Sequence, residues 1–374
     1  MSDKMILRVL DLSRGGAGVC RESDGRVIFV PYTAPGDLVR VRIQDSSRNY
    51  AHAELIEILE PSPHRQSPRC PVFGRCGGCD WQHLPYQLQW ETKVKGILHV
   101  LARAGLTLLE DIFLIPAEKP WEYRNRVQLR GQGNQLGFFR SGTREFISAD
   151  RCDIARSEIN QKWEEIRTEG NRGEKPYNVE VEILPEGEVK KTWNSPHAAR
   201  GFRQVNDEQN EKLKNWIASQ VEGSEILFDL FGGFGNLSVQ LIKKMKEIHC
   251  VDLSVPQLKS QLTPHYYFHQ SGILPWLKER ITLNRKYSSM KDQYNQGTAI
   301  IDPPRKGLNK DFFEIASALE ALYVRELVVV GCDSDSWVRD LSQWKKRGWA
   351  LRRIMAIDLF PQTHHIELVG VLIH

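Results

Sequence analysis

The stretch EILFDLFGGFGNLSVQLIKKM, residues 225–245, decides how the C-terminal part of this chain folds. An apolar run ends at Asp229, three glycines follow within six residues, and apolar positions then recur at helical spacing. A strand, a glycine turn and a helix in this order are typical of an α/β fold. Because glycine has no Cβ, the backbone of such a turn can come close to a bound ligand.

Five further apolar runs continue this alternation: IHCVDL, GTAIIDPPRKG, RELVVVGC, RRIMAIDLF and IELVGVLIH. Residues 206–374 are therefore predicted to form a doubly wound, Rossmann-like α/β domain with largely parallel strands. In such a sheet the ligand binds at the carboxyl ends of the strands. We expect Asp252, Asp302 and Cys332 to lie on that rim, beside the glycine turn.

The chain before residue 206 has a different pattern. Residues 1–60 contain short alternating segments separated by GGAG and APGD, which predicts a small OB-like β-barrel. PSPHRQSP, residues 61–68, is typical of an extended connection. Residues 61–205 are predicted to be β-rich, with one helix over 86–105. The predicted fold class is thus α/β plus β in three parts: 1–60, 61–205 and 206–374.

Composition limits the function classes. A chain of 374 residues with 41% hydrophobic and 26% charged residues is expected to form two or three folded domains. No run is long and apolar enough to predict a membrane span. Seven cysteines without a visible leader favour a reducing compartment, so the cytoplasm is expected. The net charge of +4 does not by itself predict a nucleic-acid partner.

The glycine turn and two acids suggest S-adenosylmethionine as the cofactor. Asp252 follows the second strand, where an acid can bind ribose hydroxyls, and the DPPR sequence holds Asp302 in a rigid turn. Neither a dinucleotide fingerprint nor a phosphate-binding loop is present, so a nucleoside ligand without a phosphate cradle fits better. The alternatives are plain turn geometry for the glycines and a strand terminator for DPPR.

A second candidate site is rich in cysteine. Three cysteines follow the pattern C-x5-C-x2-C in CPVFGRCGGC, and a fourth stands in ADRCDIA: Cys70, Cys76, Cys79 and Cys152. Four thiolates fit either a [4Fe–4S] cluster or a structural zinc ion. The three-plus-one spacing is more typical of an iron–sulfur centre, and unrelated buried cysteines are the third possibility. Cys20 and Cys250 are predicted to be core thiols.

The segment EYRNRVQLRGQGNQLGFFRSGTR, residues 122–144, is a candidate RNA surface. It holds five arginines against one acid, with three aromatic rings among them. If 124–130 is a strand, alternation places Arg124, Arg126, Gln128 and Arg130 on one face. Cations beside rings suit phosphate contact and base stacking, although a solvated charged face is the simpler alternative.

Cys332 ends an apolar strand, where a buried structural thiol would be the usual explanation. A thiol beside a methyl donor has a specific use, because its addition to C6 of uracil makes C5 nucleophilic. The C5 proton must then be removed by a general base. Glu367, at the start of the last predicted strand, can approach the same pocket; a surface carboxylate is the alternative.

Together these motifs resemble the RNA (uracil-5-)-methyltransferase family, in particular its iron–sulfur branch that modifies 23S ribosomal RNA. The resemblance covers nearly the whole chain, with residues 1–60 similar to the TRAM domain. It implies a [4Fe–4S] cluster on the four cysteines, Cys332 as nucleophile and Glu367 as base. Through GFRQVN, DLFGGFGN and the two acids it also implies donor contacts, at Gln204, Phe231, Asn236, Asp252 and Asp302.

The sequence departs from the family pattern in several places. The family usually has serine before the nucleophile and Asn-Pro after it, where this chain has Gly331, Asp333 and Ser334. Gly232 stands where a cysteine is usual, Asp252 replaces glutamate, and 253–297 lacks the expected helix and third-strand signature. Asp333 is expected to raise the pKa of the Cys332 thiol and slow its reaction.

The sequence therefore predicts methylation of uridine C5 in structured RNA, with 23S rRNA as the expected target and tRNA as the alternative. No protein partner and no membrane partner is predicted. Two other classes stay open. One is a catalytically weak RNA-binding protein that keeps the scaffold. The other is a methyltransferase acting on an exocyclic amine, which Arg305 and Cys332 argue against.

Overall fold

A computed structural model describes residues 4–107, 109–170, 175–195, 203–221, 225–254, 264–286 and 297–374. The chain forms two compact units. Unit 1 comprises residues 1–96, 117–197 and 360–365, and unit 2 comprises 97–116, 198–359 and 366–374. These units are defined differently from the three predicted parts 1–60, 61–205 and 206–374, so they do not test that division. It stays a prediction.

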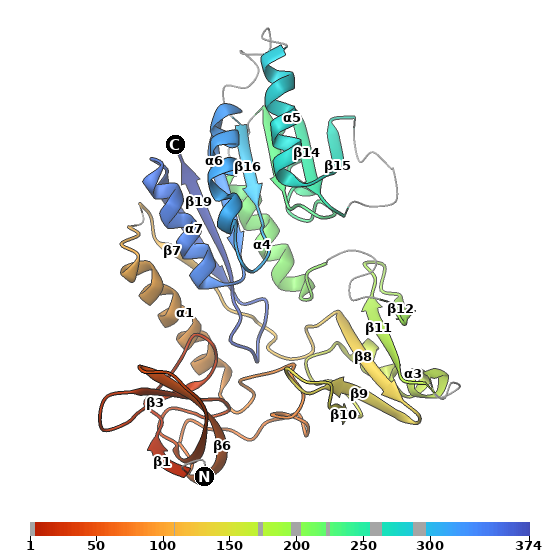
Figure 1. Cartoon of the computed structure of the whole chain (residues 1–374). Coiled ribbons are helices and arrows are strands. Elements are labelled where there is room, and N and C mark those ends of the chain that lie inside the picture. Colours follow the sequence, from red (N-terminus) through yellow and green to blue (C-terminus); the bar gives the residue numbers. More distant parts are fainter. Residues whose placement is uncertain are drawn as a thin grey trace. The chain divides into compact units, whose positions relative to one another are not determined.

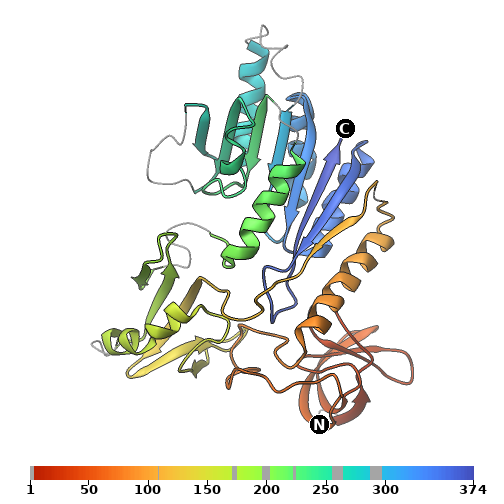
Figure 2. The same ribbon diagram turned by 180° about the vertical axis from the view of Figure 1, so that it is seen from behind.

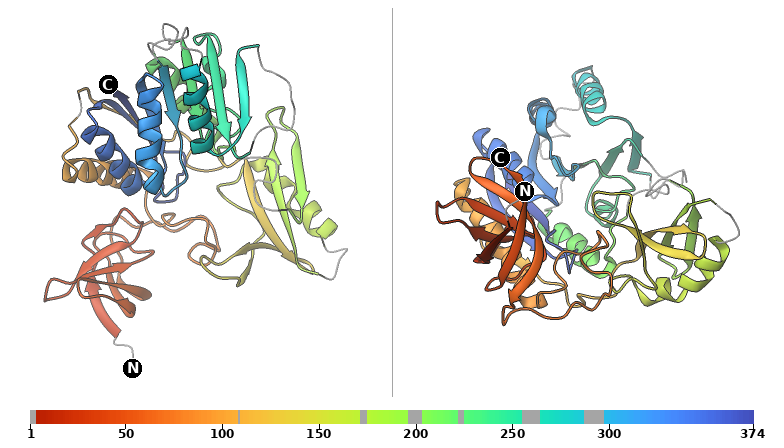
Figure 3. Two further views of the ribbon diagram at one scale, coloured as in Figure 1. Left: turned by 45° about the horizontal axis from the view of Figure 1, so that its top comes forward. Right: turned by 60° about the horizontal axis from the view of Figure 1, so that its bottom comes forward.

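The first sheet of unit 1 is a curled six-stranded sheet with the order β1-β5-β6-β4-β3-β2 (Figure 3). Its strands are β1 (Lys4–Arg8), β2 (Asp11–Leu12), β3 (Gly18–Arg21), β4 (Val27–Val30), β5 (Leu38–Ser46) and β6 (Tyr50–Glu60). Alternate side chains, such as Ile28, Val39 and Ala51, fill the interior. The buried carboxylate of Asp37 binds Arg65 at 2.7 Å, which ties the connection after β6 to this sheet.

The second sheet of unit 1 has five antiparallel strands in the order β10-β9-β8-β11-β12. They are β8 (Arg126–Gln132), β9 (Gln135–Phe139), β10 (Phe146–Ser148), β11 (Tyr177–Ile183) and β12 (Val189–Trp193). Helices α2 (Ser157–Gln161) and α3 (Trp163–Gly170) supply Ile159, Trp163 and Ile166 to its core. The predicted helix over 86–105 is α1 (Tyr86–Arg103).

Unit 2 contains an eight-stranded sheet with the order β15-β14-β13-β16-β17-β19-β18-β7 (Figure 1). The strands are β7 (Ile112–Ile115), β13 (Ile226–Leu230), β14 (Glu247–Asp252), β15 (Tyr266–Gln270), β16 (Gly297–Ile301), β17 (Val324–Gly331), β18 (Ala350–Ile357) and β19 (Glu367–Ile373). The first five in this order pair in parallel, and β19 runs antiparallel to both neighbours. Strand β7, from the predicted central part, pairs with β18 at the edge.

Helices cover both faces of this sheet. Figure 1 shows α5 (Ile273–Lys286), α6 (Phe312–Ala321) and α7 (Ser334–Lys346) on one face, and Figure 2 shows α4 (Asp207–Gln220) on the other. Among the described residues, no helix is long and apolar enough to cross a membrane.

The helix predicted after the glycine turn does not form as an α-helix. Only the short 3-10 helix Val239–Leu241 is present. Amides of Ser238, Leu241 and Lys244 bond to carbonyls three residues earlier, which tightens the segment into turns. The Ser238 hydroxyl binds Asp229 within the fold.

The region 253–297 contains more structure than its sequence indicated. Strand β15 and helix α5 lie within it, while 255–263 and 287–296 fall outside the described residues. The sequence YYFHQ of β15 has no clear apolar alternation, so this strand was missed.

Candidate active site and cysteine site

The carboxyl ends of the parallel strands in unit 2 bring the predicted residues to one rim. Asp252 ends β14, while Asp302 and Cys332 directly follow β16 and β17. Because β19 runs antiparallel, with Leu368 opposite Gly331, its first residue Glu367 also lies at this rim. The candidate nucleophile and the candidate base are therefore held at neighbouring ends of two adjacent strands, β17 and β19.

The electrostatics of the rim link these groups. Burial raises the pKa of the Cys332 thiol to about 11; Glu367 and Asp302 add to the increase and Arg305 opposes it. Burial also raises the pKa of Glu367 well above its usual value, with Asp302 contributing in the same direction. The pKa of Asp302 rises to about 7, through burial and then the charges of Asp229 and Asp252. Asp302 can therefore exchange a proton near neutral pH.

Asp333 has a structural role that the sequence analysis did not predict. Its carboxylate accepts a hydrogen bond from the Ser336 amide at 2.9 Å and caps α7. The largest effects of charged side chains on the pKa of Cys332 come from Glu367, Arg305 and Asp302. The expected increase from Asp333 stays a prediction.

Local packing requires a glycine at position 331, directly before Cys332. A Cβ at Gly331 would lie 2.7 Å from Cδ1 of Trp337, whose ring is buried and donates to the Val329 carbonyl at 2.9 Å. Since Trp337 fills the space, position 331 must be glycine in this chain. This explains one departure from the family pattern.

The glycine loop is held by the acid that ends β14. The amide of Gly233 donates to Asp252 at 3.2 Å, and the second oxygen of Asp252 accepts from the Ser254 amide at 2.7 Å. Phe231 has a positive φ of 61°, which turns the chain directly after β13. Asp252 and Phe231 therefore both shape this loop, and their contact with a methyl donor stays a prediction.

Two further residues, Asn236 and Gln204, were predicted to contact the methyl donor. Asn236 and Asn210 exchange two hydrogen bonds of 2.9 Å between their amides. Gln204 is buried, while the two residues that begin GFRQVN, at 201 and 202, lie outside the described residues. Sequence reasoning missed Asn210, because only the fold brings α4 next to the loop.

A second group that sequence reasoning missed lies beneath the loop. Asp229 is buried, burial raises its pKa to about 7, and Ser238 donates to one of its oxygens. The Cys250 thiol also bonds to this carboxyl group and, like Ser238, opposes the increase in its pKa. A Cβ at Gly232 would stand 2.6 Å from this carboxylate and 2.7 Å from Sγ of Cys250. The sulfur of Cys250 thus occupies the space that a cysteine at 232 would need.

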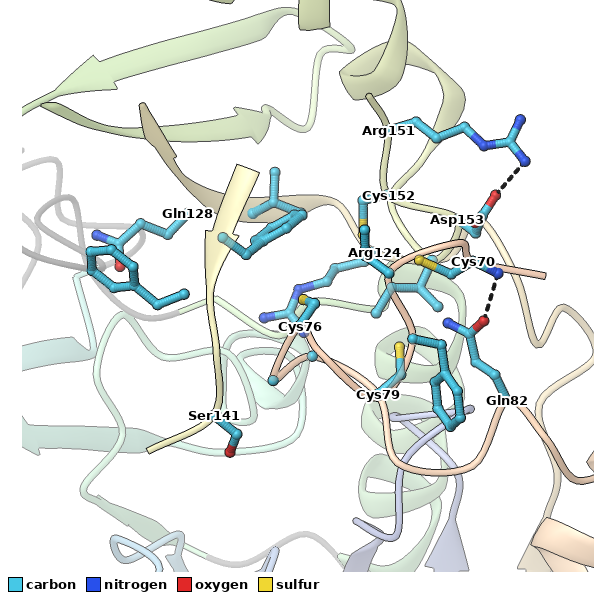
Figure 4. Close-up of a pocket in the computed structure, with 18 of the residues that line it drawn as sticks. Cys70, Cys76, Cys79, Gln82, Arg124, Gln128, Ser141, Arg151, Cys152 and Asp153 are labelled. Carbon is cyan, nitrogen blue, oxygen red and sulfur yellow. Dashed lines mark hydrogen bonds and ion pairs between the residues drawn. The ribbon is translucent and has the colours of Figure 1, made fainter. Parts of the chain in front are cut away.

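The four predicted ligand cysteines gather in unit 1. Cys70, Cys76, Cys79 and Cys152 line one cavity of about 340 Å³, and Figure 4 shows their sulfur atoms around one space. Burial raises the pKa of all four thiols. Backbone hydrogen bonds from Val72, Gly78 and Ala155 oppose this increase at Cys70, Cys76 and Cys152, respectively. Within the described residues, no group of three or more His, Cys, Asp or Glu could hold a metal ion as the side chains stand.

The predicted cationic face is only partly formed. Arg124, Gln128 and Arg130 line the same cavity, and Arg130 lies over the ring of Phe139 at 5.1 Å. The prediction is wrong for Arg126, which is buried and pairs with Glu182 at 3.0 Å. Charge alternation alone did not reveal that β11 supplies an acid opposite it.

Comparison with known proteins adds two family matches. Residues 5–56 match the TRAM domain model, and residues 275–374 match the model described as tRNA (Uracil-5-)-methyltransferase. An uncharacterised RNA methyltransferase of Bdellovibrio bacteriovorus is 29% identical, over 100% of this chain and 95% of its own length. The 23S rRNA (uracil(1939)-C(5))-methyltransferase RlmD of Shewanella amazonensis is 26% identical, over 98% and 95%.

A solved structure has the same fold. The Pyrococcus abyssi tRNA (uracil-54, C5)-methyltransferase in complex with S-adenosyl-L-homocysteine gives a TM-score of 0.67 at 20% identity. The match covers 99% of this chain and 100% of that protein. The Rossmann-like C-terminal domain and the N-terminal TRAM domain predicted from the sequence are thereby confirmed.

Proposed function

We propose that this protein transfers a methyl group from S-adenosylmethionine to C5 of a uridine in 23S rRNA. The matched family and the relatives confirm the reaction class, methylation of uridine C5 in RNA. The observation that carries the residue roles is the rim where Cys332 and Glu367 stand at neighbouring ends of two adjacent strands beside the glycine loop. Because the RlmD relative acts on 23S rRNA and the matched family is named for tRNA, tRNA is the second candidate substrate.

The reaction follows from these two groups. The thiolate of Cys332 adds to C6 of a flipped-out uracil, and the electron pair moves to C5 as an enolate. C5 then takes the methyl group, which leaves S-adenosylhomocysteine. Glu367 removes the C5 proton, and the Cys332 thiolate departs as the C5–C6 double bond forms again. Gln204, Phe231, Asn236, Asp252 and Asp302 are proposed to hold the methyl donor.

The pKa directions fit these roles. A carboxylate whose pKa is raised by burial is a stronger base than an exposed one, which suits Glu367 for removing a carbon-bound proton. The Cys332 thiol is mostly protonated in the free protein, because its pKa is about 11. Arg305 is the cation that favours the thiolate, so it is a positioning residue for the addition step.

The test combines two measurements on purified protein. 5-Methyluridine is measured by nucleoside mass spectrometry after incubation with S-adenosylmethionine and either 23S rRNA or tRNA, and adduct formation is measured with 5-fluorouridine RNA. We expect methylation of 23S rRNA, and we expect an adduct with 5-fluorouridine RNA that Cys332→Ala abolishes. The control Cys20→Ala removes a buried thiol in unit 1 and should retain both.

Each other outcome has a definite meaning. Methylation of tRNA alone would show that tRNA is the substrate and would leave the proposed reaction unchanged. An active Cys332→Ala variant would refute the covalent route and favour an exocyclic amine as the target. RNA binding without methylation of either RNA would favour the catalytically weak RNA-binding protein.

We also propose that the four cysteines hold a [4Fe–4S] cluster. A zinc ion bound at about 2.3 Å draws its four sulfurs to within roughly 4 Å of one another, so a tetrahedral zinc site needs a compact group. Here the four cysteines line one cavity of about 340 Å³. A cluster of four irons fills more space than a single zinc ion, and the backbone amides near the sulfurs suit its hydrogen-bonding needs.

Elemental analysis of anaerobically purified protein tests this proposal. Iron and acid-labile sulfide in equal amounts, with visible absorption that Cys152→Ala removes, would support a cluster. Zinc without iron would refute it. Cys250→Ala is the matched control, because that cysteine is buried in unit 2. We propose the cytoplasm as the compartment, where such a centre and its RNA substrate would both be present.

A further inference from the structure

Three aromatic rings lie together on the outer face of the six-stranded sheet. Phe29 comes from β4, while Tyr50 and His52 come from β6, and the register places Phe29 opposite His52. The rings of Phe29 and His52 are stacked with centroids 5.4 Å apart. Tyr50 meets His52 edge-on at 5.6 Å and Phe29 at 6.2 Å. We call these three residues the aromatic platform.

The aromatic platform is not part of the core. The residues that alternate with it, Ile28 and Ala51, are fully buried. Tyr50 keeps 44% of its surface exposed, and His52 is also exposed. Packing of the rings on one another explains the half-buried Phe29, but it leaves faces of Tyr50 and His52 in water.

Two arginines stand beside the platform. Arg21 lies opposite Val27 on the neighbouring strand β3, and Arg48 is in the turn just before Tyr50. Arg21 bonds only to the Gly25 carbonyl, and within the described residues neither arginine has an acidic partner. Asp45 lies opposite His52 on the other side. Cations are thus available on one side of the rings.

The charge of the whole segment argues against a purely electrostatic surface. Residues 1–60 carry nine acidic and eight basic side chains. Binding through counterion release alone needs an excess of basic groups. Exposed rings with two nearby cations are the arrangement that binds single strands by stacking.

We propose that the aromatic platform stacks an unpaired base of the RNA substrate, with Arg21 and Arg48 binding the adjacent phosphates. This inference rests on the proposed function only in taking RNA as the ligand. It gives residues 1–60 a specific task, which is to hold a single-stranded nucleotide of the same RNA whose uridine is methylated.

The test measures binding of a short fluorescein-labelled single-stranded RNA to the full chain by anisotropy, over a series of salt concentrations. Tyr50→Ala and His52→Ala are each expected to raise Kd about fivefold to a hundredfold. Neither should change the slope of log Kd against log salt, whereas Arg48→Ala should lower it by about 0.7. Ile6→Ala, which removes another exposed side chain of this sheet, is the matched control.

An RNA with abasic residues separates stacking from other effects of the substitutions. Wild type should bind it about as weakly as Tyr50→Ala binds the complete RNA, and Tyr50→Ala should lose little more. A Kd for Tyr50→Ala within twofold of wild type would overturn the proposal and point to a protein ligand for the platform. Thermal unfolding of each variant shows whether the sheet is intact.

Methylation measured on the same samples separates this proposal from the proposed function. If wild type methylates no RNA but Tyr50→Ala weakens binding, the reaction is refuted and the platform stands. If methylation proceeds and the ring substitutions leave Kd and KM unchanged, the platform alone is refuted. Support for both requires a higher KM with an almost unchanged kcat in Tyr50→Ala.

Discussion

Substitution of Gly331 by alanine should destabilise unit 2 and displace Cys332. The new Cβ would lie 2.7 Å from Cδ1 and 3.1 Å from Cβ and Cγ of Trp337. Carbon atoms at van der Waals contact are about 3.5–4.0 Å apart, so either β17 or α7 must move. The next residue after Gly331 is Cys332, and its loop connects these two elements. The movement would therefore reach the candidate nucleophile.

The expected cost is that of overpacking a filled core. Inserting a methyl group into a well-packed site typically costs about 1–3 kcal/mol. Unit 2 is of a size at which 1 kcal/mol shifts Tm by about 2–4 °C, so Tm should fall by about 2–12 °C. In a Trp337→Ala background the same substitution should cost at least about 1 kcal/mol less, because two of the three close atoms are gone.

Thermal unfolding and adduct formation with 5-fluorouridine RNA measure the two effects. Gly297→Ala is the matched control, because a Cβ there would have no neighbour nearer than 3.5 Å and its strand is adjacent in the sheet. The control should have an unchanged or slightly higher Tm, since alanine restricts the unfolded chain. Equal Tm values for Gly331→Ala and Gly297→Ala, or equal costs with and without Trp337, would refute the steric argument.

Three further predictions concern charged groups. Arg305→Met should slow alkylation of Cys332 at pH 8 about two- to fivefold, because the cation that lowers the thiol pKa is lost. Peptide mass spectrometry measures this rate, and Arg305→Lys should retain it. An unchanged rate in Arg305→Met would contradict the prediction. Asp333→Ala should cost about 1 kcal/mol through loss of the α7 cap. Faster alkylation of Cys332 in this variant would confirm that the charge of Asp333 acts on the thiol, and an unchanged rate would contradict it. Arg65→Met should destabilise unit 1 by about 3 kcal/mol in urea unfolding at pH 7. Although burial raises the pKa of Asp37, hydrogen bonds from Arg65, Ala34 and Ser62 lower it overall. The ionised carboxylate of Asp37 therefore stabilises the fold above its unfolded pKa of about 3.9. The difference in the free energy of unfolding between wild type and Arg65→Met should shrink as the pH falls below that value. A difference that does not change with pH would contradict this prediction.

Runs rich in valine, isoleucine and leucine allowed most strands of unit 2 to be predicted. GTAIID and ELVVVG are such runs, and both form buried parallel strands. Strand β15 could not be predicted in this way, since its sequence is aromatic and polar. The prediction of an α-helix after the glycine turn was wrong for another reason. Ser238 binds the buried Asp229, and this contact depends on tertiary structure.

The positions of the candidate site residues at strand ends could be predicted from the sequence. Asp302, Cys332 and Glu367 could be placed on one rim because parallel and antiparallel strands follow simple geometric rules. Side-chain partners could not be predicted, because they depend on register. Asp333 is adjacent to Cys332 in sequence yet caps a helix, and Arg126 looks like a surface cation yet pairs with Glu182 in the core.

The order of synthesis has a consequence for how this protein folds. The chain passes between the two units five times, and unit 1 is complete only when residues 360–365 have been made. By then most of unit 2, including strands β13 to β18, has already been synthesised. Neither unit has its complete sequence before the other is nearly complete, so we expect the two units to finish folding together. A fragment beginning at residue 206 would lack β7 and would expose the backbone of β18 as a site for aggregation.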